Sequence, residues 1–468
     1  MAAEKVLQSG GLRGNLKCVV ICFCMALANC QYGYDTANIS SFQAMKGFLQ
    51  QFGYEDPSLK AHGGWGIDTR TQQLITSFLN FGTMFGVLFT GPFARYFGRR
   101  SGVLVATAIA YAGVSIQVGT TSIAGICAGR ALVGASNAFF ITFTNAYVAE
   151  SSPAHLRSIT SGIFGVMPGV GSVLGTITTY LTKGLESKLC YQIPLACLYF
   201  FPTILAVVAC VVPESPRWLL VHKRKAEAEK ALYALRAGST SPDLVREEFI
   251  LMARGIEEEE ALATSSARFT EIFKGANLLR TVICVGAITS RAASGLWVFL
   301  SYGVSWMISP TVLILPTVLN EARLIISPNQ TYYFQQAGIS DPFGMQMYTS
   351  GAGIVGTALT IWLGYRSFGR RSMVLIGTTA AALCMAGAAL GGTIAPGTQE
   401  AAKNFVAWSV VYGILYGGFA NMATWAISAE VVSSRLRVHS LALATGIDYI
   451  FACKSSHLRS VYPPSAPG

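Results

Sequence analysis

Apolar stretches of about 20 residues recur along the whole chain, and each is long enough to cross a bilayer as a helix. They fall near 17–39, 73–94, 101–121, 122–148, 158–181 and 190–212, then near 279–308, 345–365, 372–394, 404–428 and, more briefly, 438–453. Charged residues make up only 12% of the sequence, against about 25% in soluble proteins. The sequence therefore predicts an all-α membrane protein that crosses the lipid bilayer many times.

One five-residue motif, FGRRS, occurs twice, at Phe97–Ser101 and Phe368–Ser372, each time between two apolar runs. Adjacent guanidinium groups are too costly to bury in hydrocarbon, so both copies are expected at a membrane surface. The other basic loops fall on the same side, which the positive-inside rule makes cytoplasmic. Residues 1–16 are too polar for a signal peptide. We therefore expect a multi-pass protein with a cytoplasmic N-terminus.

A charged stretch at 213–278 interrupts the apolar runs. It contains Glu and Lys at helical spacing in 223–230 and a run of four glutamates at 257–260, a pattern typical of amphipathic surface helices. Charge runs are usually solvated faces rather than catalytic groups. We interpret the stretch as a cytoplasmic linker between an N-terminal six-helix half at 17–212 and a C-terminal half at 279–453.

A second motif is also repeated between the two halves. Glu150 stands seven residues before Arg157, and Glu430 stands seven residues before Arg437. Both pairs follow an apolar run and lie on the predicted cytoplasmic side. Matching motifs in two half-chains predict two pseudo-repeated six-helix halves of a transporter, with the substrate path between them.

The second half departs from this repeat in two places. Residues 296–328 match nothing in the first half, and we interpret them as an atypical insert, such as a translated intron. Residues 454–468 are polar and proline-rich, unlike a spanning helix. We therefore expect an incomplete second half of about five helices and poor transport by the protein as written.

Several short motifs lie at the ends of the apolar runs. They are Gly33-Tyr34-Asp35, Gly129-Arg130, the two FGRR motifs, the two Glu-to-Arg motifs, PESPRWL at Pro213–Leu219, and Trp425 before Glu430. Together they resemble the sugar porter family of the major facilitator superfamily, in particular fungal hexose and disaccharide permeases. The resemblance implies the major facilitator fold and a monomeric secondary active transporter of the plasma membrane, without a cofactor, that moves a sugar by alternating access.

Asp35 is the residue with the clearest chemical meaning. A carboxylate within the first run is costly in hydrocarbon, so it must face a cavity or a partner, and Arg130 in the fourth run is the natural partner. An ion pair that separates and re-forms during transport can take up and release a proton. Proton-coupled sugar porters resemble this sequence at Asp35, whereas many uniporters have Asn there. The alternative is a static buried ion pair.

The charged motifs on the cytoplasmic side form the predicted gate. The resemblance implies that they lock the outward-facing state through ion networks, for which paired Arg–carboxylate contacts are well suited. These residues are Arg99, Arg100, Glu150, Arg157, Glu214, Arg217, Arg370, Arg371, Glu430 and Arg437. The alternative for single arginines is that they only anchor the topology.

A sugar needs polar groups for its hydroxyls and an aromatic face for its ring. Trp425 fits that second role by position, and the other predicted substrate residues follow the insert: Tyr332, Tyr333, Gln335 and Gln336. Other positions depart from the family. Arg95 and Arg366 stand where an Asp usually caps the loop, so this contact is expected to be absent, and Gly165 replaces a sugar-binding amide.

Other functional classes receive no support from the sequence. The five histidines are isolated and form no catalytic triad or metal spacing, so neither an enzyme nor a metal site is expected. The net charge of +11 lies in short loops rather than in a basic stripe, which argues against nucleic-acid binding. The expected partners are therefore a sugar, protons and the lipid bilayer. A facilitated-diffusion uniporter and a non-transporting family member, either a nutrient sensor or a degenerate product, remain as alternatives.

Overall fold

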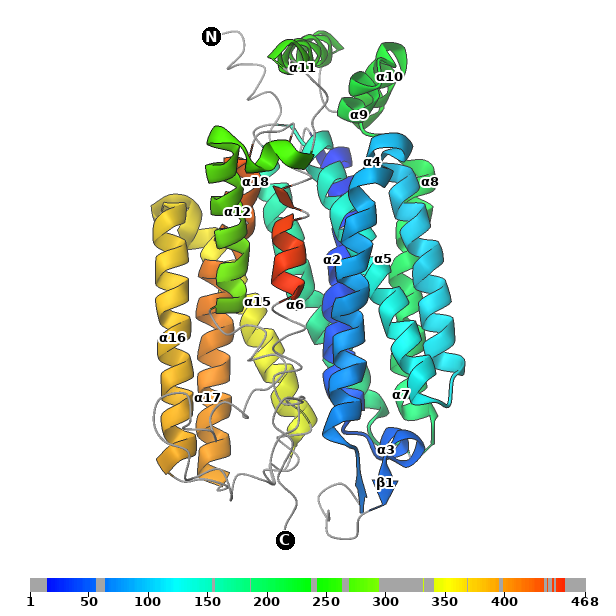
Figure 1. The fold of residues 1–468 in the computed structure, drawn as a ribbon, viewed down its shortest axis with the longest axis vertical. Helices are drawn as coiled ribbons and strands as arrows, with labels where there is room; N and C mark the ends of the chain where they lie inside the picture. Colours follow the sequence, from blue (N-terminus) through cyan, green and yellow to red (C-terminus); the bar gives the residue numbers. More distant parts are fainter. Residues whose placement is uncertain are drawn as a thin grey trace.

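The computed structural model describes residues 15–55, 64–153, 156–185, 187–236, 242–262, 269–293, 331, 341–367, 369–394, 399–432, 436, 440–441 and 443–450. The described chain is almost entirely helical, which confirms the predicted class. Two helical bundles stand side by side, and short linker helices lie across one end of them (Figure 1).

The first bundle contains the six helices of the described chain that are long and apolar enough to cross a membrane. Their elements are α2 (Leu16–Phe42), α4 (Thr69–Gly119), α5 (Ile123–Ser151), α6 (Arg157–Thr182), α7 (Leu189–Ala196), η3 (Cys197–Tyr199) and α8 (Phe200–Val211). α4 holds two spans, Arg70–Ala94 and Tyr96–Gly119, which meet near Gly98. The short elements α7, η3 and α8 follow one another without a break and form the sixth span.

Helices in this bundle approach closely where a side chain is missing. A Cβ at Gly33 of α2 would lie 1.9 Å from the carbonyl oxygen of Pro168 in α6, and one at Gly82 of α4 equally close to that of Ala131 in α5. Small residues at such crossings let backbones pack in the absence of a hydrophobic driving force within lipid. The glycines of the apolar runs therefore let α2 pack closely on α6, and α4 on α5.

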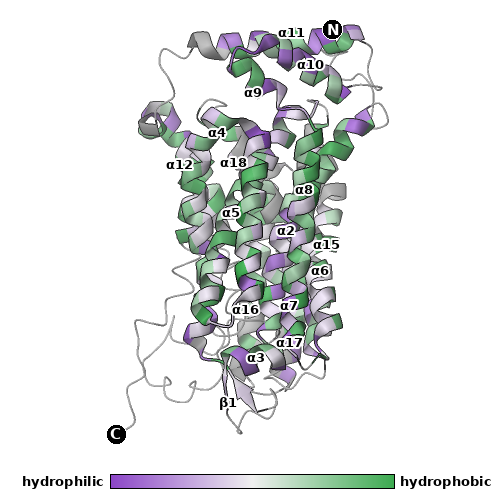
Figure 2. Ribbon diagram, turned by 90° about the vertical axis from the view of Figure 1, so that its right-hand side faces the viewer, coloured by the Kyte–Doolittle hydropathy of each residue, from purple (hydrophilic) through white to green (hydrophobic). Residues whose placement is uncertain are grey.

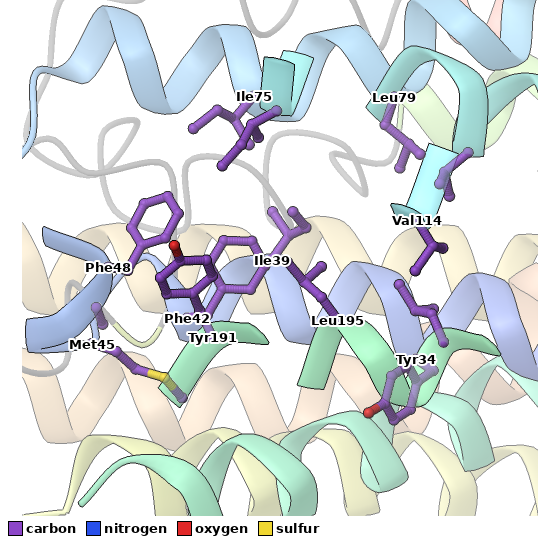
Figure 3. Close-up of a cluster of buried hydrophobic side chains, with 14 of the residues drawn as sticks. Tyr34, Ile39, Phe42, Met45, Phe48, Ile75, Leu79, Val114, Tyr191 and Leu195 are labelled. Carbon is purple, nitrogen blue, oxygen red and sulfur yellow. The ribbon is translucent and has the colours of Figure 1, made fainter. Parts of the chain in front are cut away.

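A cluster of aromatic side chains includes Phe42, Phe48 and Tyr191 (Figure 3). It involves α3 (Lys46–Phe52), which lies at the end of the bundle away from the linker helices (Figure 1). Phe48 of α3 packs against Phe42 of α2 and Tyr191 of α7, with ring centroids 4.9 and 5.5 Å apart. A two-residue antiparallel hairpin of β1 (Tyr54–Glu55) and β2 (Trp65–Gly66) follows, with Tyr54 opposite Gly66. These rings bury large apolar areas and fix α3 beneath the bundle.

The linker and the second bundle complete the fold. The linker contains α9 (Pro216–Val221), α10 (Lys225–Arg236), α11 (Pro242–Leu262) and η4 (Phe269–Phe273). Hydrophilic residues are frequent in α10 and α11, whereas hydrophobic residues are frequent in the bundles (Figure 2). The second bundle contains α12 (Gly275–Ala293), α15 (Pro342–Ser367), α16 (Arg370–Ile394), α17 (Gln399–Leu415), the π-helical η7 (Tyr416–Asn421) and α18 (Met422–Val431). Residues 440–441 and 443–450 are also helical, while the predicted insert at 296–328 lies outside the described residues.

Candidate functional site

Asp35 and Arg130 form an ion pair in the middle of the first bundle. Nη1 of Arg130 in α5 donates to Oδ1 of Asp35 in α2 at 2.6 Å, and the two side chains are 1% and 0% exposed. Removing two charges from water costs several kcal/mol per ion, which only a close partner offsets. Within the described chain, Oδ2 of Asp35 and Nε of Arg130 have no hydrogen-bond partner. The structure thus joins the two residues that the sequence paired, through one contact, and their role in proton coupling stays a prediction.

A second buried polar pair joins the same two helices. Nε2 of Gln31 in α2 donates to Oδ1 of Asn137 in α5 at 3.2 Å, and both residues are fully buried. This pair was not predicted from the sequence. The four-residue spacing between Gln31 and Asp35 could have indicated the burial of Gln31, because it places both side chains on the same face of α2.

The Glu150 cluster, made of Arg99, Glu150, Glu214 and Ser215, lies at the linker end of the bundle. Nε and Nη2 of Arg99 donate to the two carboxylate oxygens of Glu150, at 3.1 and 2.7 Å. Ser215 Oγ donates to the same carboxylate. Bidentate Arg–carboxylate pairs are strong and geometrically specific. They hold the end of α5 against the bend in α4 and the start of α9.

Glu214 supplies the carboxylate that the sequence analysis expected to be absent from the first FGRR loop. It accepts hydrogen bonds from the backbone N–H groups of Arg99 at 2.9 Å and Arg100 at 3.2 Å. Gly98 has φ 72°, and a Cβ there would lie 2.5 Å from Oε2 of Glu214. The prediction of a missing acidic contact was therefore wrong for this loop, because Glu214 replaces the carboxylate that Arg95 cannot provide.

Trp218 and Arg99 bind the same backbone carbonyl. Nε1 of Trp218 donates to the oxygen of Ala94 at 3.1 Å, and Nη1 of Arg99 donates to it at 3.2 Å. The ring of Trp218 stacks on His222, with centroids 4.0 Å apart. The PESPRWL motif thus packs directly on the first FGRR loop.

Arg236 ties the linker to the bundle. Its side chain is 2% exposed, donates to both carboxylate oxygens of Glu248 at 2.8 and 3.0 Å, and donates from Nη1 to the carbonyl oxygen of Ser151 at 3.0 Å. Burial lowers the pKa of Arg236, but the hydrogen bonds and charge of Glu248 outweigh burial and raise it. Arg236 therefore remains charged where it binds the C-terminal end of α5.

Contacts between the two bundles run along α6 and α15. Ser172 lies 3.4 Å from Ser350 through their hydroxyl oxygens. Beyond the end of α6, Nζ of Lys183 lies 3.0 Å from Oδ1 of Asp341 and 3.7 Å from the ring centroid of Tyr180. Because α6 begins at the linker end, this ion pair lies at the opposite end of the molecule.

The remaining predicted residues fall in three groups. Nη2 of Arg100 donates to the carbonyl oxygen of Cys210 at 3.1 Å, Arg217 is half-buried in α9, and Arg371 is exposed in α16. The backbones of Arg157, Arg370, Trp425 and Glu430 lie in helices, while their side chains lie outside the described part. Tyr332, Tyr333, Gln335, Gln336 and Arg437 lie outside the described residues altogether. Within the described chain, no three His, Cys, Asp or Glu residues form a group that could hold a metal ion.

Comparison with known proteins gives a consistent result. The sequence matches the family described as "Sugar (and other) transporter" over residues 21–311 and 329–455, a match that skips part of the predicted insert. It is 24% identical to "Major facilitator-type transporter ecdD" of Aspergillus rugulosus, over 91% of this chain and 75% of that protein. It is 22% identical to "Galactose transporter" of Saccharomyces cerevisiae, over 92% of this chain and 71% of that protein.

Solved structures share the fold. The proton:xylose symporter XylE bound to 6-bromo-6-deoxy-D-glucose superposes with a TM-score of 0.71 at 17% identity, covering 96% of this chain and 89% of that one. The inward open conformation of the xylose transporter XylE from E. coli gives a TM-score of 0.64 at 17% identity, covering 96% of this chain and 91% of that one. At these identities the likeness concerns the architecture of the two bundles.

Proposed function

The chain belongs to the family of sugar (and other) transporters, a family of membrane carriers rather than enzymes, and we propose that it moves a sugar by alternating access with symport of a proton. The Asp35–Arg130 pair is the observation on which the proton coupling rests. The two bundles with contacts along α6 and α15 supply the two bodies that alternating access requires.

The chemistry of the pair favours a titrating site. Asp35 is fully buried, and Arg130 is the one charged group that acts on it within the described chain. Protonation would remove the charge of Asp35 and leave the guanidinium of Arg130 without its counter-ion, a costly state in hydrocarbon. A rearrangement of α2 against α5 that relieves this cost would link proton uptake to the change between inward-facing and outward-facing states.

The charged motifs at the linker end are proposed as the cytoplasmic gate. In the first half, the hydrogen bonds of the Glu150 cluster join α4, α5 and the start of α9. We propose the same role for the matching residues Arg370, Arg371, Glu430 and Arg437, and supporting roles for Arg100, Arg157 and Arg217. The arginines of these motifs would contact the second bundle when the cytoplasmic side closes.

The substrate, location and assembly complete the proposal. The similar proteins include a galactose transporter and a probable glucose transporter, and we propose a hexose as the substrate class. Trp425 would stack on the sugar ring, with Tyr332, Tyr333, Gln335 and Gln336 around its hydroxyls. We propose that the protein is a monomer of the plasma membrane, with a cytoplasmic N-terminus, two helical halves at 17–212 and 279–453, and a cytoplasmic linker at 213–278.

Sugar-driven proton movement tests the proposal. The purified chain is reconstituted in liposomes with a pH-sensitive dye on the outside, and a panel of hexoses and disaccharides is added outside at acidic pH. Symport predicts that one sugar is taken up and that the external medium becomes more alkaline with it. Sugar uptake without alkalinisation would indicate a uniporter, and sugar binding without uptake would indicate a sensor; either result would overturn the proposed symport.

A further inference from the structure

The α2–α5 contact contains four buried polar atoms without partners. Besides Oδ2 of Asp35 and Nε of Arg130, the described chain offers no hydrogen-bond partner to Oε1 of Gln31 or Nδ2 of Asn137. Two of the four are acceptors and two are donors. A buried polar atom without a partner is costly, so its presence needs an explanation. Here all four lie on the two helices that hold the proposed proton site.

The nitrogen of the Gln31 amide is directed at Asn137. Because Nε2 of Gln31 donates to Oδ1 of Asn137, the oxygen of the amide, and not its nitrogen, is left without a partner. Gln31 stands four residues before Asp35, and side chains at this spacing lie next to each other on one helix face and can form hydrogen bonds. This spacing puts an acceptor on the face of α2 that also carries the carboxyl of Asp35.

The ionised and the protonated carboxyl use this acceptor differently. An ionised carboxylate has only acceptor atoms, so it cannot bond to Oε1 of Gln31. A protonated carboxyl gains one O–H donor, and the described chain leaves Oε1 of Gln31 open on the same face of α2. The amide oxygen of Gln31 can therefore accept a hydrogen bond from Asp35 only after Asp35 has taken up a proton.

We propose that Gln31 accepts the hydrogen bond of the protonated Asp35 carboxyl and thereby stabilises the proton-loaded transporter. A proton from water binds to Oδ2 of Asp35, the ionic attraction to Arg130 is lost, and the new O–H donates to Oε1 of Gln31. Asn137 keeps the amide of Gln31 in the orientation that presents oxygen. Gln31 and Asn137 are positioning residues in this scheme, which rests on the proposed symport.

The other titratable groups around the pair do not provide this acceptor. They are the thiol of Cys127 in α5, which lies within reach of the charge of Arg130, and the phenol of Tyr34, the chain neighbour of Asp35, whose hydroxyl donates to the carbonyl oxygen of Pro194. From α6, the carbonyl oxygen of Phe164 accepts a hydrogen bond from Asn29 of α2, and the hydroxyl of Thr178 donates to the hydroxyl of Tyr34. Arg130 is the charged neighbour and offers no acceptor.

The pH dependence of uptake tests the role of Gln31. Sugar uptake into liposomes is measured between pH 5 and 9 for the wild type, Gln31→Met and Asn29→Leu. Gln31→Met keeps the length of the side chain but removes the acceptor, so its pH midpoint is expected to move toward acid by about one pH unit, a tenfold change in proton affinity. Asn29 is a buried amide of α2 that donates to Phe164 of α6, and its variant is expected to keep the wild-type midpoint.

Each outcome decides between the proposals. A Gln31→Met midpoint equal to that of the wild type, or shifted toward alkali, overturns the role of Gln31, and so does an equal acid shift in Asn29→Leu. If Gln31→Met does not fold, Gln31→Asn replaces it, with a smaller acid shift expected and an unchanged midpoint contradicting the inference. Absence of sugar-driven proton uptake in the wild type instead overturns the proposed symport itself.

Discussion

The pair of Arg99 and Glu150 is expected to act as one unit in the stability of the first bundle. Their side chains are 14% and 15% exposed and share two hydrogen bonds, at 2.7 and 3.1 Å. Replacing Glu150 by Gln removes the charge that both bonds use and leaves the guanidinium of Arg99 shielded from water without a counter-ion. Hydrogen bonds to charged groups contribute about 1.5–3 kcal/mol, so Glu150→Gln is expected to cost about 2–3 kcal/mol. Arg99→Gln is expected to cost a similar amount, because it leaves Glu150 without its charged partner and only with the hydroxyl of Ser215.

A double-mutant cycle measures this coupling directly. The thermal unfolding midpoint in detergent is compared for the wild type, Glu150→Gln, Arg99→Gln and the double variant. Each single variant is expected to unfold at a lower temperature than the wild type. The double variant is expected to unfold at a temperature no lower than that of the less stable single variant, because the second change removes a group that has already lost its partner. A drop in the double variant equal to the sum of the two single drops would refute the reasoning, since independent sites behave additively.

Three further changes have defined outcomes. Gly98→Ala is expected to lower the unfolding midpoint, because a residue with a side chain at φ 72° costs about 1–2 kcal/mol and its Cβ would meet Glu214. Gly91→Ala in the same helix is expected to leave the midpoint unchanged or to raise it, because no atom lies within 4 Å of the added Cβ. Equal effects of the two variants would contradict this difference. Arg236→Gln is expected to release the linker from the end of α5 and to speed limited proteolysis within 213–278, and an unchanged cleavage rate would argue against the docking contact. Lys183→Glu is expected to change the free energy of unfolding by less than about 1 kcal/mol, because the side chains of the Lys183–Asp341 pair are 34% and 44% exposed. A larger loss in the thermal unfolding measurement would contradict this expectation.

The helices could be predicted from the sequence because the bilayer imposes their length. All six runs of the first half form helices that are long and apolar enough to cross a membrane, although the second and third are joined through Gly98 into α4. The pairing of Asp35 with Arg130 could also be predicted, since a charge inside an apolar run must find an opposite charge in another run. Both inferences follow from the cost of polar groups in hydrocarbon, which is visible in the sequence.

The contacts of Glu214 and Gln31 could not be predicted in the same way. Glu214 binds the backbone of Arg99 from 115 residues away, and no local spacing indicates this contact. The amide of Gln31 carries no charge, so its burial gives a weaker signal than that of Asp35, and its orientation depends on Asn137 in another helix. Such details depend on how α2, α5 and the linker pack together.

The central claim is that Asp35 takes up the proton that accompanies the sugar. The most direct measurement compares sugar-driven alkalinisation of the external medium for the wild type and Asp35→Asn in liposomes, together with sugar exchange in the absence of a proton gradient. Asn keeps the size of the side chain and an acceptor for Arg130 but cannot titrate. The account predicts that Asp35→Asn exchanges sugar across the membrane yet moves no protons. Alkalinisation by Asp35→Asn at the wild-type ratio of protons to sugar would contradict it.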